Sequence, residues 1–199
     1  GQYLPLLKSV TKEQIEVLRQ PSQALLLNSQ SALNVVGTDL GDQSEFTLIV
    51  VAKVSAAGGK LVRLDRGIPN GPSFDLISSN SGHLALNIRD GGDAAKASLK
   101  WGRDTSGVIC IRFDGGIGML HAEGIRASGT RPEPVELESL LRALPMQRIC
   151  IGDGAFFSKP DAKVTHYLFD FLVYTSALSD DEALAIQSAL VRHFFDPGG

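Results

Sequence analysis

The fold is decided by the stretch FDFLVYTSALSDDEALAIQSALVRHF, residues 169–194, in which an aromatic strand is followed by a capped helix. Ser179 and Glu182 have the spacing of a capping box, which closes the first turn of a helix. Asp180 and Asp181 then lie where the helix dipole favours negative charge. Apolar residues follow at helical spacing: Ala183, Ile186, Leu190 and Phe194. The pattern predicts one C-terminal amphipathic helix, and it explains the acidic start without a catalytic or metal role.

Upstream of this helix, short apolar segments alternate with turn residues. EFTLIVVAKVS (45–55) is apolar on both alternating faces, which is typical of a strand in the middle of a layered structure. FDLISS (74–79) and HLALNIRD (83–90) are separated by a polar turn and predict a hairpin. The longest strand predicted is VTHYLFDFLVYT (164–175). This arrangement favours an all-β sandwich or barrel over parallel strand–helix–strand units.

Residues 1–23 differ from the rest of the chain. Thr11 and Gln14 have capping-box spacing in TKEQIEVLRQ, and Pro21 ends the predicted helix. A helix this short is marginal alone, so we expect it to pack on the main body or on a partner, or to be the tail of a linker. The sequence therefore predicts a helical extension or linker over 1–23 and a sandwich over 24–199.

Three more segments occur in a familiar order: ALLLNSQSALNVVGTDLGDQSEFTLIVVAKV (24–54), GVICIRFDGGIGMLHAEGIRAS (107–128) and ICIGDGAFF (149–157). With the final strand and helix, they resemble the laminin-G-like domains of the concanavalin A-like jelly-roll superfamily over residues 24–195. The resemblance implies two stacked antiparallel sheets, one of them curved to give a concave face. That superfamily includes lectins, adhesion modules, virion and tail proteins of bacterial viruses, and some glycoside hydrolases. The fold therefore does not decide the function.

Composition and charge exclude several classes of partner. The 199 residues include 19 Lys and Arg against 22 Asp and Glu, a net charge of −3 that offers no basic footprint for a nucleic acid. No apolar run reaches the roughly 18 residues of a membrane helix, so we expect no membrane insertion. The opening GQYLPLLKSV lacks the pattern of a signal peptide, although a start at Gly1 leaves a removed signal open. The resemblance implies an extracellular or virion-surface location.

We do not expect an enzyme. Retaining glycosidases need two carboxylates about 5 Å apart, and the hydrolase branch of the superfamily supplies them from a Glu-x-Asp-x-x-Glu run, which this sequence lacks. The nearest acidic cluster, Glu133, Glu136 and Glu138, is punctuated by prolines. We expect it to lead into a short helical turn over 138–144.

Acidic residues in two loops have the chemistry of calcium ligands. Asp39 and Asp42 lie in TDLGDQ, and Asp90 and Asp93 lie in RDGGD. Several members of the superfamily hold calcium on loops at one edge of the sandwich, and such a site needs roughly six to eight oxygens. The other interpretation is that Asp and Gly simply form turns. We therefore expect no cofactor, and calcium is the one alternative.

A glycan site usually needs an aromatic face for the sugar ring beside polar groups for its hydroxyls. Trp101 lies in SLKWGRD near Arg103, and the adjacent Phe156 and Phe157 lie in the glycine turn DGAFFSKPD. These four are the candidate ligand-binding residues. The alternative for Trp101 is a structural residue that caps the edge of the sandwich. The alternative for the phenylalanine pair is that one of them fills the core.

Alternation along the last strand predicts that Phe169, Phe171 and Val173 face the core between the sheets. Asp170 lies among apolar neighbours, where an ionised carboxylate needs hydrogen bonds or a cation. Its candidate partners are Arg112, Arg148 and His166.

The two cysteines, Cys110 and Cys150, lie inside apolar strand segments. Such residues usually behave as small buried hydrophobic side chains. The alternative is a disulfide between neighbouring strands.

These observations favour a non-catalytic recognition module that binds a glycan or a protein surface, within a larger extracellular or virus-particle assembly. The alternative is a purely structural bacteriophage particle protein, anchored to neighbouring virion proteins or to its own copies by residues 1–23. Glycoside hydrolase activity is a distant third.

Overall fold

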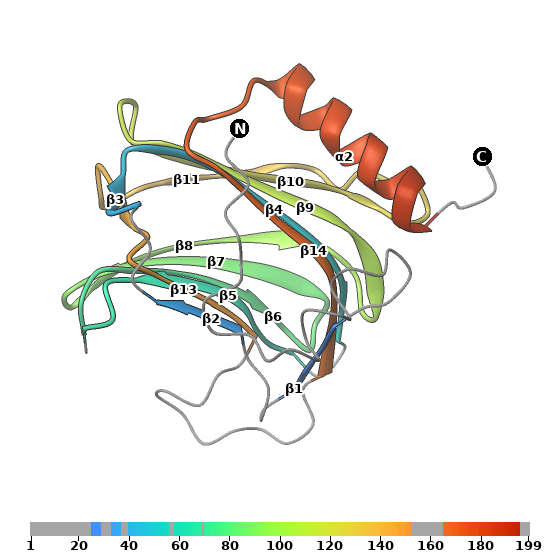
Figure 1. Ribbon diagram of the computed structural model, residues 1–199, viewed down its shortest axis with the longest axis horizontal. Coiled ribbons are helices and arrows are strands. Elements are labelled where there is room, and N and C mark those ends of the chain that lie inside the picture. Colours follow the sequence, from blue (N-terminus) through green and yellow to red (C-terminus); the bar gives the residue numbers. More distant parts are fainter. Residues whose placement is uncertain are drawn as a thin grey trace.

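The computed structural model describes residues 25–28, 33–36, 40–55, 58–68, 70–152 and 165–195. These residues form two six-stranded antiparallel sheets that face each other, with one helix on the outer side of the first sheet (Figure 1). The all-β sandwich with a C-terminal helix is confirmed. The N-terminal helix predicted within residues 1–23 lies outside the described residues.

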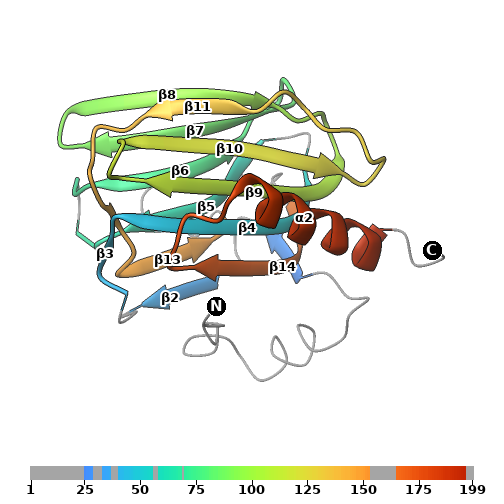
Figure 2. The ribbon, with the colours of Figure 1, turned by 90° about the horizontal axis from the view of Figure 1, so that it is seen from above.

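The first sheet, called sheet A, contains in spatial order β1 (Leu25–Asn28), β14 (Thr165–Tyr174), β4 (Glu45–Val54), β9 (Thr105–Asp114), β10 (Met119–Arg126) and β11 (Val135–Glu138). The second, sheet B, contains β2 (Leu33–Val36), β13 (Arg148–Ile151), β5 (Gly59–Asp65), β6 (Ser73–Ser78), β7 (His83–Asp90) and β8 (Asp93–Lys100). A short pair, β3 (Asp42–Gln43) and β12 (Leu144–Pro145), joins one end of the sandwich. Figure 2 shows the two sheets from above, with the helix α2 (Asp180–Phe195) along β4 and β9.

The strand β4 is buried on both faces, as predicted. Phe46, Leu48 and Val50 point between the sheets, while Ile49 and Val51 point outward beneath α2. Burial on both sides explains why this segment has no polar face.

The helix α2 begins as its sequence predicts. The Ser179 backbone N–H donates to Glu182 Oε2 at 2.9 Å, and the Glu182 N–H donates to Ser179 Oγ at 3.3 Å, which completes the capping box. Its buried residues Ala183 and Val191 pack on an apolar cluster that includes Cys110. The helix thereby covers the outer face of sheet A.

The strand β14 differs from its predicted alternation. A register shift between Leu168 and Asp170 marks a β-bulge against β4. Phe171 and Val173 face the core as predicted, but Phe169 packs outside sheet A, 5.3 Å from the Phe195 ring centroid. The prediction for Phe169 was wrong because a bulge inserts one extra residue into the strand. The alternation of side chains between the two faces of the sheet is therefore interrupted at that point.

Two other predictions are corrected. Residues 138–144 form no helical turn: β11 ends at Glu138 and β12 begins at Leu144. The disulfide alternative also fails, since Cys110 lies in β9 of sheet A and Cys150 in β13 of sheet B, and both are free and buried. Among the described residues, no helix is long and apolar enough to cross a membrane.

Candidate functional site

The outer face of sheet B is polar over five of its strands. Inward residues such as Leu64, Leu76 and Leu86 fill the core, so alternation turns their neighbours outward. The antiparallel register then sets outward residues side by side in rows that cross the strands. One row runs from β13 to β8 through Cys150, Arg63, Asp75, Asn87 and Lys96. The next contains Arg148, Asp65, Ser73, Arg89 and Ala94. We call this surface the sheet B face.

Two buried carboxylates hold basic side chains in the sheet B face. Asp65 is 2% exposed and accepts hydrogen bonds from Arg148 Nε at 2.7 Å and from Arg63 Nε at 2.6 Å. Burial raises the pKa of Asp65, but the hydrogen bonds from Arg148, Arg63 and the Gly67 amide outweigh it and hold that pKa below its ordinary value. Asp65 therefore stays ionised and fixes both guanidinium groups.

The second carboxylate, Asp75, is fully buried. Its Oδ1 lies 3.5 Å from Arg63 Nη1 and 3.9 Å from Lys60 Nζ. Its Oδ2 and the neighbouring Ser73 Oγ have no hydrogen-bond partner. Leaving buried polar atoms unpaired costs free energy.

The sheet B face is basic, although the chain as a whole is acidic. Its outward positions in β5 to β8 and β13 carry six cationic residues and two carboxylates, Asp65 and Asp75, within a chain of net charge −3. The cationic residues are Lys60, Arg63, Arg89, Lys96, Lys100 and Arg148. Arg89, Lys96 and Lys100 are exposed and make no ion pair within the described part of the chain. Positive charge is thus available for an anionic ligand.

Trp101 does not lie in the sheet B face. It is completely buried, its Nε1 donates to the Thr105 carbonyl at 3.2 Å, and its ring lies against Gly107 and Gly124. It offers no face to a sugar, so its prediction as a ligand-binding residue was wrong. It belongs to the hydrophobic core between the two sheets.

The other three candidate ligand-binding residues are not brought together with it. Arg103 is exposed in the turn between β8 and β9, outside the rows of the sheet B face. Phe156 and Phe157 lie outside the described residues. A ligand-binding role for these three stays a prediction.

The predicted calcium ligands are not assembled into a site by the described residues. The carboxylate of Asp42 accepts hydrogen bonds from Arg66 and, at 2.7 Å, from Gln147, and these bonds lower its pKa. Asp90 and Asp93 are exposed and face each other across the β7–β8 turn. Asp39 lies outside the described residues. Within the described ranges, no three His, Cys, Asp or Glu residues are grouped to hold a metal.

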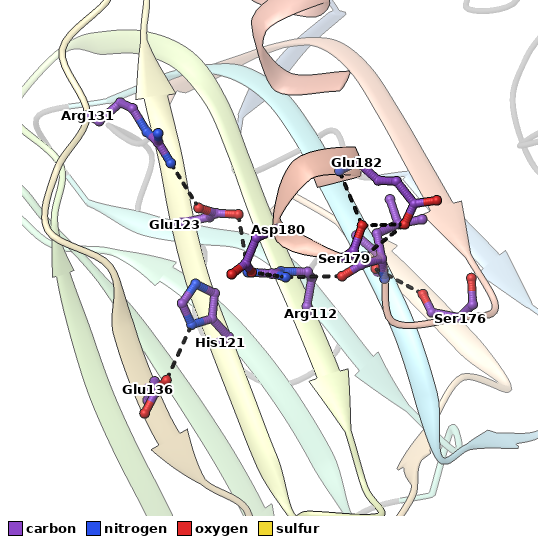
Figure 3. Close-up of polar contacts among 11 residues, drawn as sticks. Arg112, His121, Glu123, Arg131, Glu136, Ser176, Ser179, Asp180 and Glu182 are labelled. Atoms are coloured by element: carbon purple, nitrogen blue, oxygen red, sulfur yellow. Dashed lines mark hydrogen bonds and ion pairs between the residues drawn. The ribbon is translucent and has the colours of Figure 1, made fainter. Parts of the chain in front are cut away.

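A second polar cluster lies beside α2 on the outer face of sheet A. Figure 3 shows Arg112 between Glu123 and Asp180, at 3.4 Å and 2.6 Å. Arg112 also donates to the Leu178 carbonyl at 3.0 Å, and Thr47 Oγ1 donates to the Ser176 carbonyl at 2.9 Å. These contacts attach the start of α2 to the sheet, so we interpret the cluster as structural.

The predicted partners of Asp170 are engaged elsewhere. Arg112 binds Glu123 and Asp180, Arg148 binds Asp65, and the His166 Nδ1 accepts the Ser55 N–H at 3.0 Å. Asp170 accepts the Phe171 N–H at 2.8 Å instead. Burial raises the pKa of Asp170, while that hydrogen bond and the charge of His193 oppose the rise.

Sequence reasoning missed the sheet B face. A signal was present, because KLVRLD, SFDLIS, LNIRD and AKASLK alternate apolar with polar residues. Alternation alone does not tell which strands are neighbours or in what register, and the rows depend on both.

The whole chain matches no protein-family model, and no curated protein matches it. Solved structures with a similar fold include NanB sialidase from Streptococcus pneumoniae, with a TM-score of 0.60 and 14% identity over 80% of this chain and 26% of that one. The CBM40 domain of the Ruminococcus gnavus IT-sialidase has a TM-score of 0.56 and 15% identity, over 82% of this chain and 98% of that one. A botulinum neurotoxin serotype D/C binding domain has a TM-score of 0.59 and 11% identity, over 84% and 43%.

These likenesses establish the fold as a lectin-like jelly-roll β-sandwich of the kind found in carbohydrate-binding modules and toxin binding domains. The chain spans only about a quarter of the NanB sialidase that it matches, but nearly all of the CBM40 domain. The narrower resemblance to laminin-G-like domains stays a prediction.

Proposed function

We propose that this protein is a non-catalytic recognition module that binds a glycan carrying an acid group on the sheet B face. The observation that carries the proposal is the basic surface of that face, which lies on a chain of negative net charge. Exposed cationic side chains attract a carboxylate or sulfate and can hydrogen-bond to it.

The absence of aromatic residues argues for an acidic rather than a neutral sugar. Neutral sugars are usually held by an aromatic ring. The outward positions of β5 to β8 and β13 contain no Phe, Tyr or Trp. Charge must therefore replace stacking as the main source of affinity.

The comparisons with solved structures support the proposal of an acidic glycan as the ligand. The Ruminococcus gnavus CBM40 domain was solved with alpha2,3 sialyllactose, an acidic glycan, and it matches this chain with a TM-score of 0.56 and 16% identity. The match covers 97% of the length of that CBM40 domain.

The test is a glycan array followed by titration calorimetry on the acidic and neutral hits. Arg89→Gln and Lys96→Gln should each weaken binding of an acidic glycan about fivefold, which corresponds to about 1 kcal/mol for one exposed charge contact. The matched control is Arg192→Gln, because Arg192 is an exposed arginine on α2. Equal losses in Arg89→Gln and Arg192→Gln would exclude the sheet B face as the site.

The structural role in a bacteriophage particle stays the alternative prediction, and so does the extracellular or virion-surface location. Light scattering on the whole chain and on a variant without residues 1–23 distinguishes the two functions. A recognition module should remain a monomer in both. A particle component should assemble, and it should do so only with that segment present.

A further inference from the structure

We propose that the sheet B face takes an internal, extended segment of an acidic saccharide chain, and not a single terminal acidic sugar. This inference rests on the proposed function and names the form of the ligand. It follows from the breadth of the face and from the spacing of its charges.

The cationic surface is broad. Lys60 lies on β5 and Lys96 on β8, three strand intervals away, or about 14 Å at the usual spacing of strands. Lys96 and Lys100 lie on one strand, four residues or about 14 Å apart. Arg89 lies opposite Ala94 on β8, two residues from Lys96 on the side away from Lys100. One sugar ring cannot contact all of these cations, whereas a chain of several sugars can.

Small side chains separate the exposed cations on β7 and β8. The small outward residues on these two strands are Ala85, Ala94 and Ser98. On β6 the outward residue between Lys60 and Ala85 is the half-buried Ile77. The carboxylates Asp65 and Asp75 are buried below the surface and hold Arg63, Arg148 and Lys60 from beneath. A chain can pass along such exposed cations and extend beyond them at both ends, while recognition of a terminal sugar usually needs a concave pocket.

The separation of the cations favours a ligand with repeated acid groups. Each acid group that reaches a separate cation adds to the affinity, because later contacts form within an already bound chain. A single-stranded nucleic acid also carries repeated charge, but proteins that bind it stack its bases on aromatic side chains. The sheet B face has no Phe, Tyr or Trp at its outward positions.

The experiment is titration of the full chain with heparin-derived and oligogalacturonate oligosaccharides of increasing length. The comparison probes are alpha2,3 sialyllactose, a neutral cello-oligosaccharide and a single-stranded oligonucleotide. We expect affinity for the acidic oligosaccharides to rise about tenfold from disaccharide to hexasaccharide and then to level off. Lys100→Gln should weaken the hexasaccharide and leave the disaccharide nearly unchanged, with Arg192→Gln as the control.

Sialyllactose binding as tightly as the longest acidic oligosaccharide would overturn this inference and leave the proposed function standing. An oligonucleotide binding as tightly as the hexasaccharide would also overturn it, since the face would then recognise charge alone. Failure of every acidic saccharide to bind would instead contradict the proposed function itself. Circular dichroism of each variant confirms that it is folded.

Discussion

Single residues in the sheet B face combine burial with charge. Asp65 is 2% exposed, yet it stays ionised because Arg148 and Arg63 surround it. A buried ion pair adds little net stability as a whole, but removing one partner leaves an uncompensated charge. This asymmetry makes the pair a sensitive point of the fold.

Arg148→Met should therefore destabilise the protein by about 3 kcal/mol, although it adds apolar surface. The double variant Arg148→Met with Asp65→Asn should recover part of that loss, because it removes the charge that Arg63 and the Gly67 amide alone would then have to compensate. Urea unfolding of the two variants measures both values. A single variant as stable as the parent would show that Asp65 does not depend on Arg148.

We expect His166 to make the stability of the fold sensitive to mild acid. It is 1% exposed and its Nδ1 accepts the Ser55 N–H, so burial lowers its pKa from 6.5 to about 4. The unfolded chain takes up a proton near pH 6.5, whereas the folded chain does not until about pH 4. The free energy of unfolding should thus fall between pH 6.5 and pH 4, by up to about 3 kcal/mol from this residue.

Urea unfolding at pH 7 and pH 5 measures that dependence. In His166→Asn, which keeps an acceptor but does not titrate, the difference between the two pH values should shrink. An unchanged difference would assign the pH dependence to other groups.

The helix α2 is held to sheet A by polar contacts at its start, whereas a buried polar side chain in its middle has no hydrogen-bond partner. Gln187 is completely buried between α2 and sheet A, and neither its Nε2 nor its Oε1 has a hydrogen-bond partner. Replacing an unsatisfied buried amide by an apolar side chain of similar size removes a desolvation cost. Gln187→Leu should raise the stability by about 1 kcal/mol, measured by thermal unfolding. A decrease would mean that the amide has a partner such as bound water.

The strand β10 passes close to the Trp101 ring at Gly124. A Cβ atom on Gly124 would lie 2.6 Å from the Trp101 ring and 2.7 Å from the Val108 carbonyl oxygen. Gly124→Ala should cost about 2 kcal/mol, because the backbone and a buried ring would both have to move. Gly92→Ala is the control, since nothing lies within 4 Å of its Cβ position. Similar melting temperatures for the two variants would contradict this account.

For the helix and the strands, the sequence predicted correctly the features that depend on local chemistry. The cap of α2 and the two-sided burial of β4 were predictable because both depend on spacing along one segment. The bulge in β14 was not predictable, since it arises from pairing with β4. The strand β11 was missed because the helical preference of Glu138 and the leucines after it is weaker than pairing with β10.

For the whole molecule, the sandwich and its helix could be predicted, but the candidate site could not. Aromatic residues suggested a site at Trp101, which turned out to be core. On each strand taken alone, the residues of the sheet B face look like ordinary solvent-exposed strand positions. Only the register of five strands makes them one surface.

The described loops also predict how the molecule responds to calcium. Asp42 already accepts hydrogen bonds from Arg66 and Gln147. Asp90 and Asp93 supply only two carboxylates, whereas a calcium site needs roughly six to eight oxygen ligands. Excess chelator should therefore leave the melting temperature and glycan binding unchanged. A rise in melting temperature with millimolar calcium would indicate a site that includes residues beyond those described.

The place of β14 in sheet A has a consequence for how the chain folds during synthesis. β14 lies between β1 and β4, so residues 25–28 can pair only with a strand made about 140 residues later. β13 separates β2 from β5 in sheet B in the same way. The first strands to be synthesised therefore remain unpaired until β13 and β14 have been made. Pairing over such a long sequence separation makes folding slow. A nascent chain stopped before residue 165 should accordingly be sensitive to protease and should be a natural client for chaperones.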